Sequence, residues 1–159
     1  MAVHPRRRRL VAVVGPSVLF GFSGCLGALV PDVDEEGDAL VEELWIYDRG
    51  SDQGEPVADT HYGHWHGGLP DVPRGSVLSL DAEFRNHDRE PIPIGDDEPN
   101  QLRTQRTGKA HETIAVDNRG DHVRIAGEKV GEAEIVFQLV ERDERIWESP
   151  PITLAVSST

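Results

Sequence analysis

Short segments in which apolar and polar residues alternate recur along the chain from residue 40 onward. The alternation is clearest in Leu78–Phe84, Ala133–Leu139 and Ile152–Val156. Because successive side chains of a β-strand point to opposite faces, this period of two predicts strands with one buried face. Further segments are rich in β-forming residues: Leu44–Tyr47, Thr113–Val116 and Val123–Ile125.

Turn-forming residues separate these segments. They are found in Asp48–Ser51, Gly67–Pro70, Gly95–Asp97 and Asn118–Gly120. No window of twelve residues has an apolar stripe with helical spacing. We therefore predict an all-β domain of seven to nine short strands in about 120 residues, arranged as a two-sheet β-sandwich.

Glycine turns separate alternating strands in three consecutive segments, Ile114–Gly120, Val123–Gly127 and Gly131–Val136, which together cover roughly 25 residues. This arrangement resembles the second half of bacterial Ig-like domains. It implies a single immunoglobulin-like β-sandwich that spans residues 40–159. Its motifs are structural glycines and apolar positions, so they bear on fold rather than on activity.

Three further segments are His64–Pro70, Gly120–Val123 and Phe137–Leu139. Together they loosely resemble a small group of exported Ig-like proteins that carry additional histidines. Where such proteins place further histidines after the long strand, this chain has Glu141–Glu144. If those histidines form a site in the relatives, this departure argues against the same site here. The resemblance implies no activity.

The first residues have the pattern of an export signal. Arg6–Arg9 precede a 15-residue apolar stretch, Leu10–Gly24, that ends in small residues. A membrane-spanning helix is the weaker alternative, because about 20 apolar residues are needed and Gly15-Pro16 interrupts the stretch. Arg7–Val11 also resembles a twin-arginine signal, which exports folded proteins; an arginine-rich general-secretion signal is the alternative.

Phe22–Cys25 resembles a lipobox, in which the cysteine is acylated and becomes the new N-terminus, although Phe22 replaces the usual aliphatic residue. Cys25 is the only cysteine, so no intramolecular disulfide is possible. We therefore expect residues 1–24 to be a signal and residues 25–39 to be an acidic tether. The lipid would hold the domain on the outer face of the cell membrane.

Acidic residues dominate the chain after the signal. The full sequence has a formal charge of −13, and removal of the four arginines of the signal leaves −17. This balance argues strongly against sequence-independent binding to nucleic acid, which requires Lys and Arg to neutralise phosphates. The composition resembles that of exported proteins of salt-loving archaea, since molar salt screens such self-repulsion. An acidic protein from a high-GC bacterium is the alternative.

Three histidines within six residues are the candidate metal ligands. His64 and His66 share a face if the segment is a strand. His61 joins them only if Tyr62-Gly63 bends or bulges the chain, and His122 is the next candidate. Zn²⁺, Cu²⁺ or Ni²⁺ would suit such imidazoles. The alternative is a solvated, hydrogen-bonding face. A fourth ligand could also be His87, His111 or one of the many carboxylates.

The sequence does not support catalysis. It has no phosphate-binding glycine loop, nucleophile elbow or cysteine-based zinc pattern in the mature domain. We expect Trp45, Trp65 and Trp147 to be buried in the sandwich, with a carbohydrate-stacking surface as the alternative. The function predicted is a non-catalytic lipoprotein module for adhesion, envelope structure or binding, with a protein partner at the envelope. A histidine-based metal-binding or metal-chaperone lipoprotein is the alternative.

Overall fold

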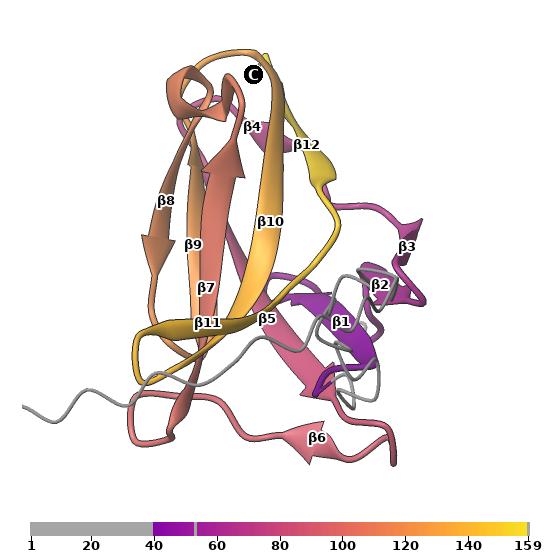
Figure 1. Cartoon of the computed structure of the whole chain (residues 1–159). Coiled ribbons are helices and arrows are strands. Elements are labelled where there is room, and N and C mark those ends of the chain that lie inside the picture. The colour runs from indigo at the N-terminus through magenta and orange to yellow at the C-terminus, as the bar shows by residue number, and fades with distance from the viewer. Residues whose placement is uncertain (1–39, 53, 159) are drawn as a thin grey trace, which may run out of the picture. The chain divides into compact units, whose positions relative to one another are not determined.

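The computed structural model describes residues 40–52 and 54–158 (Figure 1). The predicted signal, the tether and Cys25 lie outside these residues. The described residues form twelve strands and one 3₁₀ turn, η1 (Ala110–Glu112). The all-β prediction is thereby confirmed. None of the helical structure in this part of the chain is long and apolar enough to cross a membrane.

The strands make two sheets that pack together, as predicted. The seven-stranded sheet has the order β3 (His64–Gly67), β2 (Ala58–His61), β1 (Glu43–Asp48), β5 (Val77–Arg85), β9 (His122–Gly127), β8 (Ile114–Asn118), and β6 (Pro91–Ile92) pairs with β5. The five-stranded sheet has the order β11 (Glu144–Glu148), β10 (Gly131–Glu141), β12 (Ile152–Ser157), β4 (Val72–Pro73), and β7 (Asn100–Thr107) pairs with β10. Whether the sandwich is immunoglobulin-like stays a prediction.

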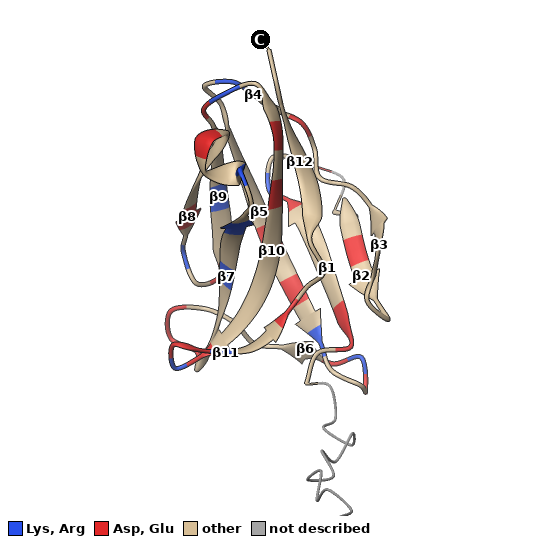
Figure 2. Cartoon of the chain, turned by 45° about the horizontal axis from the view of Figure 1, so that its top comes forward, with Lys and Arg blue, Asp and Glu red and all other residues tan. Residues whose placement is uncertain are grey.

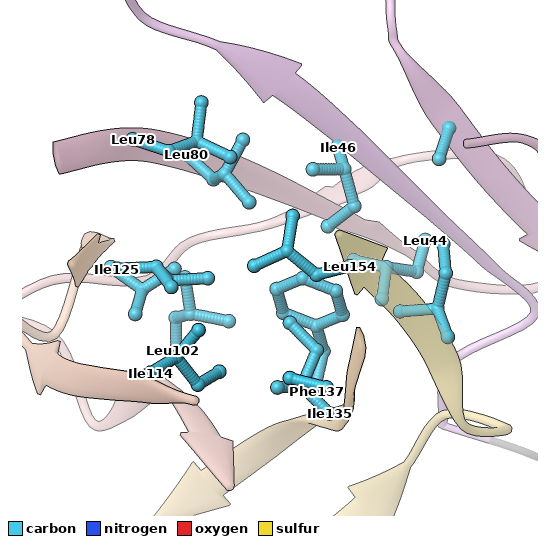
Figure 3. Close-up of a cluster of buried hydrophobic side chains, with 14 of the residues drawn as sticks. Leu44, Ile46, Leu78, Leu80, Leu102, Ile114, Ile125, Ile135, Phe137 and Leu154 are labelled. Atoms are coloured by element: carbon cyan, nitrogen blue, oxygen red, sulfur yellow. The ribbon is translucent and has the colours of Figure 1, made fainter. Parts of the chain in front are cut away.

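The alternating segments place their apolar residues between the two sheets. In β5, Leu78, Leu80 and Phe84 are buried, and in β12 the same holds for Ile152, Leu154 and Val156. Figure 3 shows side chains from both sheets meeting in one cluster. Burial of these apolar surfaces is the main force that holds the sheets together. The largest fully buried side chains are Phe84, Phe137, Leu44, Ile46, Leu80, Leu102, Ile114, Ile125, Ile135, Leu139 and Leu154.

The central strand β10 is buried on both faces in its second half. Gln138 is 4% exposed although it alternates with the core residues Phe137 and Leu139. Its amide Nε2 donates to Gln105 Oε1 on β7 at 3.0 Å and to Glu148 Oε2 on β11 at 2.6 Å. Long side chains from the two flanking strands therefore cover the outward side of β10.

The predicted number of strands is too low, because two tight hairpins and a polar strand were not expected. Tyr62-Gly63 joins β2 to β3, and Arg142-Asp143 joins β10 to β11. All four residues have positive φ angles, from 49° to 75°, as type I′ hairpin turns require. Neither turn has the usual Asn-Gly sequence. In β7 only Leu102 and Thr104 are buried, so no apolar alternation marks the strand.

The prediction that the three tryptophans are buried is wrong, because each of them is only partly buried. The strand neighbours of Trp45, Leu44 and Ile46, are fully buried, so Trp45 lies on the outward face of β1. Trp65 and Trp147 pack against the core and are half-buried. Trp65 Nε1 also donates to the carbonyl of Pro150 at 2.9 Å. The outward position of Trp45 follows from strand alternation, which outweighs its hydrophobicity.

Candidate functional site

The β2–β3 hairpin brings the three clustered histidines to one face of the seven-stranded sheet. The turn pairs His61 directly with His64 and pairs Asp59 with His66. Cross-strand partners and residues two apart share a face, so all four side chains lie on the side that faces away from the core. The condition that Tyr62-Gly63 must bend the chain is met, by a hairpin turn rather than by a bulge.

Two of these imidazoles are stacked. The ring centroids of His61 and His66 are 4.8 Å apart, and their planes differ by 17°. His61 is also in edge contact with Tyr62, with a centroid distance of 5.3 Å. The Nδ1 atom of His61 lies 3.5 Å from a carboxylate oxygen of Asp59. His61 is therefore held from three sides, by an aromatic ring, an imidazole and a carboxylate.

The stack does not have the geometry of a metal centre. The lone pair of an imidazole nitrogen lies in the ring plane, so two nearly parallel rings direct their lone pairs side by side rather than at one point. In residues 40–52 and 54–158, no group of three or more His, Cys, Asp or Glu side chains is placed to hold a metal ion. A zinc site requires at least three such ligands. Within the described residues, the hairpin therefore provides no such set of three ligands.

The other candidate histidines lie elsewhere. His122 is on β9, four strands from β3 and therefore roughly 19 Å across the sheet. Its Nδ1 lies 2.6 Å from Asp121 Oδ1. His87 is bonded through Nδ1 to Glu42 Oε2 at 2.9 Å. His111 is in η1, which leads into the opposite edge strand β8. None of the three joins His64 and His66.

Asp121 and His122 belong to a small charged network. Arg49 Nε contacts Asp81 Oδ1 at 2.7 Å, and an Arg49 terminal nitrogen lies 3.4 Å from Asp121 Oδ2. Burial raises the pKa of Asp121, but the hydrogen bond with His122, the charge of His122 and Arg49 outweigh it and hold that pKa below its ordinary value. Hydrogen bonding to Asp81 raises the pKa of Arg49. This network accounts for His122 without a metal.

A second stacked pair lies beside the histidines on the same face, and sequence reasoning did not predict it. The guanidinium carbon of Arg85 lies 3.8 Å from the ring centroid of Trp45. Arg85 Nε also donates to Glu83 at 2.6 Å. The register places Trp45 beside Asp59 on β2 and beside Glu83 on β5. Alternation of Glu43, Trp45 and Tyr47 with buried residues was the signal that could have revealed this face.

We call this surface the histidine–tryptophan face and define it as Asp59, His61, His64, His66, Trp45, Glu83 and Arg85. It combines aromatic, cationic and anionic groups from four adjacent strands. Figure 2 shows that acidic residues also occupy strands of both sheets, among them β2, β5 and β10.

Comparison with known proteins adds no family to this description. A scan against protein-family models gives no match, and a search of curated proteins finds no similar sequence.

Proposed function

We propose that the protein is a non-catalytic module anchored to the outer face of the cell membrane by a lipid on Cys25. Its sandwich binds an envelope partner through the histidine–tryptophan face. The observation that carries this proposal is the pair of adjacent stacks, His61 on His66 and Arg85 over Trp45. Both hold functional groups in fixed positions on an outward sheet face.

The fixed conformations of these stacked side chains favour the binding of a partner. Fixing a flexible side chain at an interface costs about 0.5–1.5 kcal/mol, and side chains that are already fixed avoid much of that cost. Tryptophan and arginine are also the residue types that most often dominate interface energies. Arg85 is additionally fixed by Glu83, so the ring and the guanidinium present one rigid surface. The partner expected from this mixture is a polar surface with both charge and aromatic character.

The anchor is supported by the sequence. Four arginines, an apolar stretch and the single cysteine follow one another as they do in lipoprotein signals. The segment 25–39 is acidic and has few large apolar side chains that a core could bury, which is typical of a tether. The acid excess of the mature chain supports adaptation to high salt outside the cell.

Fractionation of cells tests the anchored location. The full chain should sediment with membranes and be cut by protease added to intact cells, whereas Cys25→Ser should move the domain to the soluble exported fraction. Retention of Cys25→Ser in the membrane fraction would contradict the lipid anchor. Protection of the full chain from external protease would contradict the surface location.

Site-specific photo-crosslinking in intact cells tests the face. A photoreactive residue at position 66 should give a discrete adduct that is lost with Trp45→Ala. The matched control is position 153, since Thr153 is exposed on β12 of the other sheet. The same adducts from positions 66 and 153 would contradict a partner on the histidine–tryptophan face.

Metal binding remains the second candidate function, because the hairpin places His61, His64 and His66 on one face. A shift of the His61–His66 stack would be required before their nitrogens converge on one ion. The stacked arrangement of His61 and His66 therefore makes metal binding the weaker candidate function.

A further inference from the structure

A cleft of about 800 Å³ opens on the inner side of β2, opposite to the histidine–tryptophan face. Its volume lies in the range of small-molecule sites. Its floor contains the buried residues Val41, Thr60 and Ser149, and Trp147 and Pro150 supply apolar wall. The remaining lining residues stand at its rim: Glu42, Tyr62, Gly63, His87 and Glu148.

One residue that lines the cleft, Thr60, has a hydroxyl group with no partner within the described residues. Thr60 is 2% exposed, and its Oγ1 is buried without a hydrogen bond. Leaving such a group unsatisfied is costly, so the unpaired hydroxyl of a lining residue indicates a position where a ligand can bond. A threonine hydroxyl accepts as well as donates. The second unpaired hydroxyl of the described residues, on Thr104, does not line this cleft.

The charges at the rim favour a cation. Two carboxylates line the cleft, Glu42 and Glu148, and no Lys or Arg does. One oxygen of each is engaged: Glu42 Oε2 with His87, and Glu148 Oε2 with Gln138 and Arg145. The other oxygen of each has no hydrogen bond within the described residues. Both can therefore accept from an N–H donor, while an anionic ligand would be repelled.

The apolar walls of the cleft favour a ligand whose cationic group is attached to a hydrocarbon chain. Trp147 is in edge contact with Phe84 of the core at a centroid distance of 5.8 Å, which fixes its ring at the cleft. An aromatic wall attracts both hydrocarbon and cationic groups. Val41 and Pro150 add further apolar surface.

We propose that this cleft binds a primary alkylammonium group, with its N–H donors on Thr60 Oγ1 and the rim carboxylates and its methylene stem on Trp147. A free amine and the lysine side chain of a protein both have this chemistry. The inference goes beyond the proposed function, because it concerns the opposite side of β2 and does not depend on the lipid anchor.

Titration of the full chain in non-ionic detergent and amine-free buffer tests the site, with the indole N–H signals followed by NMR. Butylammonium is the free probe, and N-acetyl-lysine amide carries the same group as a side chain. Butanol and butyrate are the neutral and anionic controls. Either cation should shift the Trp147 signal saturably and leave the Trp45 signal in place. The probe with the higher affinity shows whether the natural ligand is a free amine or a lysine side chain. No saturable shift with either, or equal binding of butanol or butyrate, overturns the proposal.

Two isosteric variants test the ligand contacts. Thr60→Val removes only the hydroxyl and should weaken butylammonium binding about tenfold, since hydrogen bonds to charged groups are strong. Glu42→Gln should weaken it as well. Thr104→Val removes the other unpaired hydroxyl and is the matched control, with unchanged affinity expected. Thermal melts verify that each variant folds. Wild-type affinity in folded Thr60→Val would overturn the assignment.

Discussion

The imidazole rings of His61 and His66 stack with their centroids 4.8 Å apart. The Tyr62-Gly63 turn makes this possible, because it folds β3 back on β2 and sets the two rings on diagonal positions of one sheet face. Ring stacking therefore offers an explanation for the clustered histidines other than metal binding. Three imidazoles share a face, as a metal site requires, but the two that touch do so through their ring faces rather than through a shared ion.

The first prediction concerns metal content. Protein purified without a histidine tag should contain no stoichiometric Zn, Cu or Ni, because the stacked rings direct their lone pairs along parallel planes. Elemental analysis after loading with each metal measures this. One equivalent of metal that is lost in His64→Ala and His66→Ala but kept in His111→Ala would establish the alternative, a metal-binding protein.

The second prediction concerns Gly67 at the end of β3. An added Cβ would lie 2.4 Å from the carbonyl oxygen of Val57, and the φ of Gly67 is +76°. Gly75 has a similar φ, +84°, with nothing near the same position. Gly75→Ala should therefore cost roughly 1–2 kcal/mol of unfolding free energy for the left-handed backbone alone. Gly67→Ala should cost about 1–3 kcal/mol more for the clash. Denaturant unfolding of both variants measures the difference, and equal losses would contradict this account of the hairpin.

The third prediction concerns acid stability. Burial raises the pKa of the Asp121 carboxyl, but the His122 hydrogen bond and the nearby positive charges outweigh it and hold that pKa below its ordinary value. A depressed pKa contributes stability that is present above the unfolded-state value and is lost as the pH falls through the folded-state value. Asp121→Asn should therefore lower stability at about pH 6 and show a smaller loss between about pH 4 and pH 2.

Urea unfolding across that pH range measures the difference for Asp121→Asn. The effect should be small, because the Asp121 side chain is 48% exposed and solvent screens its contacts. Asp71→Asn is the control, since Asp71 is exposed and has no ion pair within the described residues. A steeper acid-side loss in Asp121→Asn than in the wild type would contradict the role of this network.

The fourth prediction concerns salt. Without the predicted signal, residues 25–159 carry a formal charge of −17, so their acidic residues repel one another in dilute buffer. At about 1 M salt the Debye length falls to about 3 Å and screens this repulsion. The unfolding temperature should therefore rise with KCl concentration. Maximal stability in low salt would exclude the adaptation to high salt.

The strand pattern was predictable where one face of a strand is apolar and the other polar. β5, β9 and β12 have that pattern, and each has its predicted face in the core. β7 escaped prediction because Thr104 takes an inward position that an apolar residue usually fills. The Tyr62-Gly63 turn escaped because a tyrosine at positive φ is uncommon, so its sequence resembles a strand interior.

The site was predictable only in part. The shared face of His64 and His66 follows from their spacing, whereas the place of His61 depended on a turn that the sequence does not announce. His122 could not be assigned, because only the strand order shows that β9 is far from β3. The cleft beside Thr60 joins residues from distant parts of the chain, so no local pattern contains it.

Intact-mass spectrometry of the protein extracted from cell membranes tests the anchored module most directly. We predict a chain that begins at Cys25 and carries the added mass of one or more acyl groups. A membrane-extracted chain that retains residues 1–24, or one that begins at Cys25 without added mass, would contradict the lipid anchor on which the proposed function rests.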